Sequence, residues 1–96
     1  MPHQGYDWKR ITASERVYVG SADFAGLILA ADGVGTADVT VYDGQDAGGR
    51  QFGTFRTPVS RSESHGVPGS AAFHQGLFVA IGSNVEECIV LYRPAR

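Results

Sequence analysis

The chain has 96 residues, of which 43% are hydrophobic and 19% are charged, and its formal net charge is −2 at pH 7. This length fits one compact domain, and the apolar content is too high for an intrinsically disordered chain. The slightly acidic balance provides no concentrated basic surface, so direct binding to nucleic acid is not expected.

Residues 1–14 are polar and show no periodic pattern, which predicts an extended N-terminal arm ahead of a single domain over residues 15–96. The arm nevertheless contains Tyr6, Trp8 and Ile11. Because disordered tails seldom contain tryptophan, we expect the arm to pack on its own domain or on a neighbouring subunit. Amphipathic aromatic residues often anchor interfaces, so Tyr6 and Trp8 are the first predicted interface residues, and Ile11 of the same arm is predicted with them.

Strand-like segments follow the arm in quick succession. Residues 15–19 alternate between apolar and polar types, as a half-buried strand does. Residues 24–31 form a continuous apolar run, whose length and flanking turn residues favour a buried strand over a helix. Residues 32–35 read DGVG and predict a reversal that uses the positive φ angles open to glycine. Residues 37–42 read ADVTVY, so the two valines are predicted to share one face.

The next segment, residues 50–57, also alternates, but Phe52 and Phe55 are out of phase by one residue. This predicts a β-bulge at Gly53. The polar stretch 58–65 fits either an edge strand or a long exposed loop.

The C-terminal third of the chain contains the last predicted strands. Pro68 and Gly69 predict a turn. The apolar set is completed by Phe73 and by strands at residues 77–81 and 87–92, and residues 82–84 are predicted to turn between those two strands.

The spacing of these segments predicts the fold class. No window shows the 3.6-residue period of an amphipathic helix over helical length. The thirteen glycines are spread along the chain, as many short elements with many turns require. We therefore predict an all-β fold, either a small β-sandwich or a jelly-roll-like barrel of about seven or eight short strands.

Motifs that bind phosphate or metal ions are incomplete in this sequence. The GVG at residues 33–35 lacks a third glycine and precedes a predicted strand, whereas a nucleotide-binding turn precedes a helix. Asp43 and Asp46 lie on a glycine-rich loop where calcium is conceivable, but the EF-hand spacing is absent and Asx turns are the better account.

The histidines and the single cysteine also lack the context of a reactive site. His3, His65 and His74 are too scattered for a local metal site, so we interpret them as surface or loop residues. Cys88 lies in an apolar run without a neighbouring histidine or basic residue, so a small buried hydrophobe is predicted. No catalytic, cofactor-binding or metal-binding residue is assigned, and no cofactor is expected.

Four aromatic residues suggest a different kind of site. Tyr6, Trp8, Tyr18 and Tyr42 are candidates for a platform that binds sugars or a partner, although scattered aromatics more often serve the core and interfaces. A small carbohydrate-binding module is therefore an alternative function. A hydrolase ranks last, because no nucleophile–base pair or metal set can be named.

Several segments follow a pattern found in one family. Residues 38–44 read DVTVYDG and are followed by GGR at 48–50, by FHQGLFV at 73–79 and by IVLY at 89–92. In these features the stretch 17–92 resembles small virion-associated proteins of tailed bacteriophages. Many of those proteins carry a V-T-V-Y-D-G segment, an F-x-x-G-L-x-V segment and a closing V-x-V-x-Y strand.

The resemblance implies a non-enzymatic structural protein of a phage virion, assembled in the cytoplasm of the host bacterium. A decoration or cement protein of the capsid is the first expectation, and a neck or tail component is the alternative. The implied partners are other copies of the chain and other virion proteins such as the major capsid protein. No membrane partner is expected, because the N-terminus lacks a signal-peptide core and no apolar run approaches about 18 residues.

Overall fold

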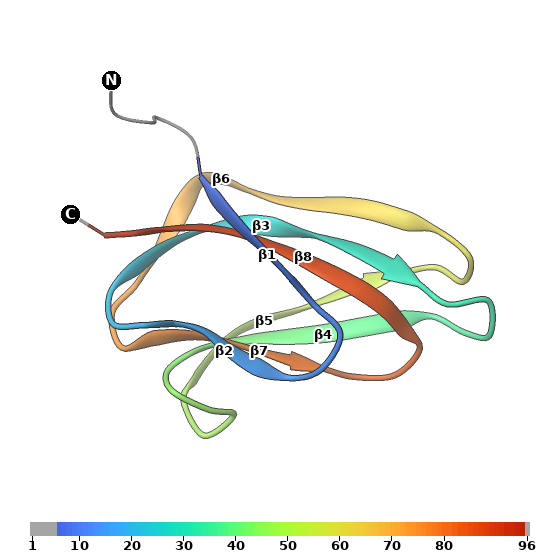
Figure 1. The fold of residues 1–96 in the computed structure, drawn as a ribbon, viewed down its shortest axis with the longest axis horizontal. Helices are drawn as coiled ribbons and strands as arrows, with labels where there is room; N and C mark the ends of the chain where they lie inside the picture. The colour runs from blue at the N-terminus through green and yellow to red at the C-terminus, as the bar shows by residue number, and fades with distance from the viewer. Residues whose placement is uncertain (1–5, 96) are drawn as a thin grey trace.

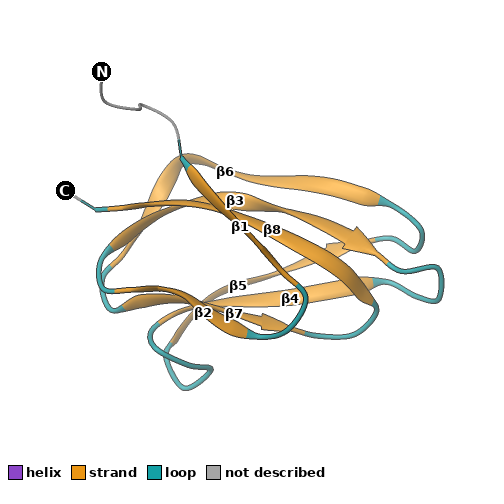
Figure 2. Cartoon of the chain, in the orientation of Figure 1, coloured by secondary structure: helices purple, strands orange, loops and turns teal. Residues whose placement is uncertain are grey.

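Two four-stranded antiparallel sheets lie face to face in the computed structural model, which describes residues 6–95 (Figure 1). Strands and the loops between them make up this whole range, as Figure 2 shows, and it contains no helix that could span a membrane. The eight strands are β1 (Asp7–Ile11), β2 (Glu15–Val19), β3 (Ala22–Ala31), β4 (Ala37–Asp43), β5 (Arg50–Thr57), β6 (Ser62–Phe73), β7 (Gly76–Ile81) and β8 (Val85–Pro94).

The strand order identifies the sandwich as a jelly roll. The first sheet has the order β1-β8-β3-β6, and the second has the order β2-β7-β4-β5. The first strand therefore pairs with the last, the second with the seventh, the third with the sixth and the fourth with the fifth. Such nested pairing results when one long hairpin wraps into two sheets, which is the jelly-roll arrangement. The predicted all-β sandwich of about eight strands is confirmed.

The core lies between the sheets and follows the alternation of side chains along each strand. In β4, Val39 and Val41 point inward as predicted. In β3 the register shifts between Phe24 and Gly26, so that burial continues at Leu27 and every second residue after it. The largest fully buried side chains are Phe24, Phe73, Ile11, Leu27, Leu29, Leu77, Val39, Val41, Val79, Val90, Thr57 and Cys88.

Part of the predicted N-terminal arm is a strand of the sandwich. Residues 7–11 form β1, which pairs with β8 along its whole length, from Asp7 opposite Tyr92 to Ile11 opposite Cys88. Only Ile11 of this strand is buried, because β1 is an edge strand and most of its side chains face solvent. A mostly polar edge strand has the composition of an arm, which is why the sequence pattern missed it. Residues 1–5 lie outside the described range.

The polar stretch 58–65 contains a turn and then the start of β6, the other edge strand of the first sheet. The turn predicted at Pro68 and Gly69 lies instead inside β6. There residues 67–70 form a bulge opposite Ala25 of β3. An edge strand tolerates proline because one side of its backbone has no ladder partner.

The reversal predicted between β3 and β4 occurs, but a side chain shapes it. The Oδ1 atom of Asp32 accepts hydrogen bonds from the backbone N–H groups of Val34, at 2.8 Å, and Gly35, at 3.2 Å. Gly33 and Gly35 are not among the residues with positive φ. The Asx geometry of Asp32 therefore replaces the glycine conformation that the sequence suggested.

Cys88 is fully buried, as the sequence predicted. Burial raises the pKa of its thiol to about 12. The thiol is therefore protonated at neutral pH and acts as a small hydrophobic side chain of the core.

Candidate functional site

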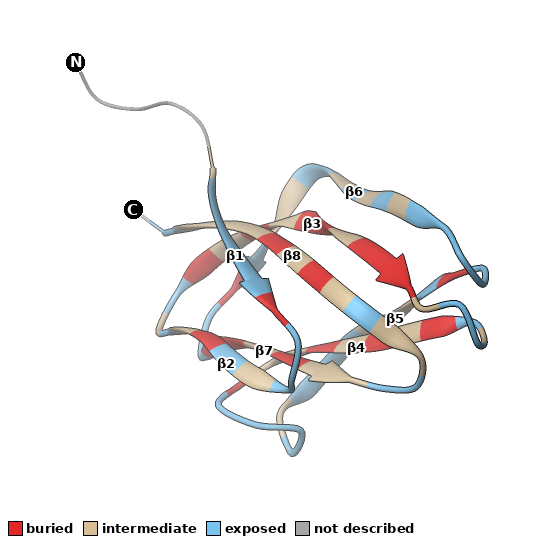
Figure 3. Cartoon of the chain, turned by 45° about the vertical axis from the view of Figure 1, so that its right-hand side comes forward, coloured by how far each residue is buried: buried red, intermediate tan, exposed pale blue. Residues whose placement is uncertain are grey.

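The outer face of the first sheet carries an exposed apolar patch. Trp8 of β1 is 68% exposed and lies opposite Leu91 of β8. Ile89 of β8 lies opposite Ile28 of β3, and Ile28, Ile89 and Leu91 are all half-buried. Ile28, Ile89 and Leu91 lie next to core residues of their strands, so their side chains point outward. Trp8 lies on the same face, because it is the cross-strand partner of Leu91. Figure 3 shows the mostly exposed β1 beside β8, on which buried and half-buried residues alternate. We call Trp8, Ile28, Ile89 and Leu91 the outer patch.

Two ion pairs flank the outer patch. On one side Arg10 Nε lies 2.7 Å from Glu87 Oε1, and on the other side Arg93 Nε lies 3.2 Å from Asp23 Oδ2. Both pairs are partly exposed and contribute little stability by themselves. Protein interfaces usually have an apolar centre that is surrounded by polar and paired charged side chains.

The structure separates the three predicted interface residues. Trp8 is accessible, and the ring of Tyr6 is half-buried with the Arg93 guanidinium 4.6 Å from its centroid. Ile11 is only 2% exposed and lies in the core, so its assignment to an interface is wrong. It is instead the residue that anchors β1 to the sandwich. Tyr6 and Trp8, together with Asp7 and Tyr92, line a shallow hollow at the start of β1.

The predicted platform of four aromatic residues does not form one surface. Tyr18 packs near Tyr92, with ring centroids 5.9 Å apart. Tyr42 lies on the outer face of the second sheet, where its ring centroid is 6.3 Å from that of Phe78. Only Tyr6 and Trp8 of the four share a hollow. The sequence did not indicate Ile28, Ile89 and Leu91 as surface residues, because runs that are apolar on both faces suggest complete burial.

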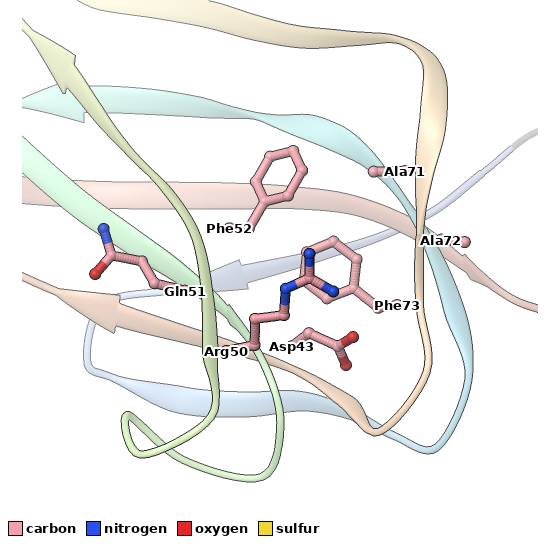
Figure 4. A pocket seen from close by; sticks show the side chains of 7 residues that line it. All are labelled: Asp43, Arg50, Gln51, Phe52, Ala71, Ala72 and Phe73. Atoms are coloured by element: carbon pink, nitrogen blue, oxygen red, sulfur yellow. The ribbon is translucent and has the colours of Figure 1, made fainter.

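A second site lies between β5 and β6, where the two sheets diverge. It is a cavity of about 280 Å³ lined by Asp43, Arg50, Gln51, Phe52, Ala71, Ala72 and Phe73 (Figure 4). The bulge predicted at Gly53 lies one residue earlier, at Phe52, which lines this cavity. Val41 pairs with Gly53 and Tyr42 pairs with Gln51, which leaves Phe52 as the extra residue of β5. We call this cavity the seam pocket.

Aromatic rings form the apolar wall of the seam pocket. The ring centroids of Phe52 and Phe73 lie 5.4 Å apart, and both lie within 6 Å of the centroid of the buried Phe24. Phe52 is 43% exposed, although it contacts this cluster. The pocket therefore offers an aromatic surface that is continuous with the core.

Asp43 ties the seam pocket to the neighbouring turn. Its carboxylate accepts hydrogen bonds from the backbone N–H groups of His74, at 3.1 Å, and Gln75, at 2.9 Å. Burial alone raises the pKa of Asp43, but the N–H groups of this turn outweigh it, and the pKa lies below its ordinary value of 3.8. Asp43 is thus ionised at neutral pH and holds the β6–β7 turn against the end of β4.

We expect Asp43→Asn to lower the free energy of unfolding by about 1 kcal/mol at pH 7, because the amide is a weaker acceptor than the carboxylate. A carboxyl group whose pKa is lower in the folded state than in the unfolded state stabilises the fold at pH values above the unfolded-state pKa. This stabilisation is lost as the pH falls through the folded-state pKa. The difference between wild type and variant should therefore shrink as the pH falls below the ordinary pKa of 3.8, and it should be lost once the pH is below the lower folded-state pKa. Urea denaturation at several pH values measures it. The exposed Asp7→Asn is the control, and a difference independent of pH would contradict this account.

The remaining predicted polar residues have structural contacts. His65 Nε2 lies 3.0 Å from Thr57 Oγ1, and Asp46 Oδ1 accepts a hydrogen bond from the N–H of Gly48 at 2.8 Å, so its predicted Asx turn is confirmed. His74 lies in the β6–β7 turn, and His3 lies outside the described residues. Within residues 6–95 no group of three His, Cys, Asp or Glu side chains is placed to hold a metal ion.

Comparison of the chain with protein-family models, with curated proteins and with solved structures finds no match.

Proposed function

We propose that the chain is a non-enzymatic structural subunit of a tailed-phage virion, and specifically a decoration or cement protein of the capsid. The outer patch carries this proposal. It exposes the only tryptophan of the chain beside three half-buried aliphatic side chains. A continuous apolar surface with a polar rim is the mark of a contact site, and aromatic residues at its centre supply most of the binding energy.

Two further observations support a role in an assembly. A 96-residue domain has a thin core, and contacts with neighbouring subunits add to its stability by mass action. The jelly roll is an architecture used in viral capsid proteins, although it also occurs in lectins. Many copies of one weak contact, repeated with other copies of the chain and with proteins such as the major capsid protein, would hold a surface layer by avidity.

The first experiment is peptide mass spectrometry and antibody labelling of intact particles purified from a lysate of the source. A capsid decoration protein gives label over the whole head, whereas a neck or tail component gives one spot. Absence of the chain from purified particles would end the proposal of a virion protein.

The outer patch is tested by a matched pair of variants. Trp8→Lys should reduce the amount of protein bound to particles by about tenfold or more, because it places a charge at the centre of the apolar contact. Val34→Lys places the same charge at an exposed apolar residue of the β3–β4 turn and should bind like wild type. Equal binding of both variants would show that the outer patch is not the contact.

The carbohydrate-binding alternative rests on the hollow lined by Tyr6, Asp7, Trp8 and Tyr92. Aromatic rings beside a carboxylate suit the apolar face and the hydroxyl groups of a sugar. Because Trp8 is the only tryptophan, its fluorescence reports on this hollow alone. A saturable change with one member of a glycan panel would favour this function, and an unchanged spectrum across the panel would exclude it.

A further inference from the structure

Each sheet ends in two edge strands, and β1 is the edge strand whose pairing is uninterrupted. The edge strands are β1 and β6 in the first sheet and β2 and β5 in the second. A register shift interrupts the pairing of β2 with β7, of β6 with β3 and of β5 with β4. The pairing of β1 with β8 has no such shift. Bulges on edge strands hinder pairing with another chain, so β1 is the edge at which a further strand can be added.

The free side of β1 carries charges that are compensated within the subunit. β1 pairs with β8 alone, and Figure 3 shows it beside β8 at the border of the first sheet. Lys9 forms an ion pair with Glu15 of β2, and Arg10 forms one with Glu87 of β8. Charged residues on an edge strand usually oppose pairing with another chain. Here both cations are held by carboxylates of their own subunit, which weakens that opposition.

The sequence of β1 is complementary to an antiparallel copy of itself in one register. Asp7, Trp8 and Lys9 follow one another, and all three are exposed. A two-fold axis at Trp8 places Asp7 of each copy opposite Lys9 of the other. An axis at Asp7, Lys9 or Arg10 would instead place two like charges directly opposite each other, which destabilises a strand pair. Trp8 is the one uncharged residue among the exposed residues of β1, so the charges select the register centred on it.

This register also joins the apolar surfaces of the two copies. Residues directly opposite each other in an antiparallel pair lie on the same face, so the two Trp8 side chains become neighbours. Each Trp8 already lies opposite Leu91 of its own subunit. The two outer patches therefore become one apolar surface across the axis, and the 68% exposed side chain of Trp8 gains an aromatic partner.

We propose that a second copy of the chain pairs antiparallel with β1 about Trp8, so that the two first sheets form one continuous sheet. Main-chain hydrogen bonds and the tryptophan pair supply the affinity. The exposed pairs of Asp7 with Lys9 fix the register and add little affinity. Because the contact is small, the dimer is weak in free solution and becomes stable where many copies share a surface. This inference rests on the proposed function, because it names a second copy as one partner of the outer patch.

The test is disulfide trapping in a glutathione buffer with the variants Asp7→Cys and Lys9→Cys. In the proposed register these two positions lie opposite each other, at a Cα separation of about 5 Å that a disulfide can bridge. Two copies of the same variant are diagonal neighbours at about 7–8 Å, which is too far. The mixed pair also retains one native contact of Asp7 with Lys9. Cys88 is fully buried in every variant, so wild type measures its background.

An equimolar mixture of the two variants should give about tenfold more mixed disulfide than either homodimer, and intact mass spectrometry distinguishes the three products. Random collision would give only about a twofold excess, because two of the four possible combinations are mixed. Val34→Cys, at an exposed residue of the β3–β4 turn, measures the rate of such collisions. A mixed product at the random level would overturn the inference.

Sedimentation equilibrium tests the unmodified chain. Wild type should show a monomer–dimer equilibrium, Trp8→Lys should weaken it by about tenfold or more, and Val34→Lys should behave like wild type. A wild-type chain that remains monomeric up to about 1 mM would overturn the inference, because so weak a contact could not select a register. A dimer that Trp8→Lys leaves intact would do so too, because it would form through another surface.

The two proposals fail separately. A chain that is present in particles but gives no excess of mixed disulfide refutes the pairing through β1 alone. A chain that dimerises through β1 but is absent from particles refutes the virion function alone.

Discussion

Gly26→Ala is expected to destabilise the protein by about 3 kcal/mol or more, which is a large part of the stability of a small domain. Gly26 adopts a φ angle of +131°, which residues with a side chain rarely adopt. A Cβ atom at this position would lie 2.2 Å from the carbonyl oxygen of His65, a backbone atom that cannot move without disturbing β6. Strain and collision therefore add together at the point where β3 changes the phase of its buried side chains.

The control for this substitution is its neighbour across the strand pair. Gly66 is the partner of Gly26, but an added Cβ atom there would meet no atom within 4 Å. Gly66→Ala should change the free energy of unfolding by less than about 1 kcal/mol. Urea denaturation of the two variants measures the difference, and equal losses would contradict the close approach of β3 to β6.

Phe24→Ala is expected to lower the free energy of unfolding by about 3–5 kcal/mol. Phe24 is fully buried, and its ring centroid lies 5.6 Å from that of Phe73 and 5.7 Å from that of Phe52. Removal of this ring leaves a cavity at the centre of the aromatic cluster. The first sheet then loses the contacts of this ring with Phe52 and Phe55 of β5.

Phe78→Ala is the matched control, because Phe78 is only half-buried on the outer face of the second sheet. We expect it to cost about 1 kcal/mol. Thermal or urea unfolding compares the two variants. Similar losses would show that the cluster around Phe24 is not the part of the core on which stability depends most.

The sequence by itself was sufficient to predict the all-β class, most strands and most turns. In β4 the buried Val39 and Val41 alternate with residues that are less buried. Such alternation depends only on the geometry of the strand itself. The bulge near the start of β5 was also visible locally to within one residue, because Phe52 and Phe55 were out of phase. These signals do not depend on which other strand lies alongside.

Only the tertiary structure decided the role of the residues whose local signal was misleading. Ile11 is buried because β1 pairs with β8, and Pro68 lies inside an edge strand because one side of β6 has no partner. The outer patch and the seam pocket join residues from strands distant in sequence, such as Trp8 with Leu91 and Phe52 with Phe73. Such neighbours arise from long-range pairing of the two sheets, which leaves no periodic trace in any single segment.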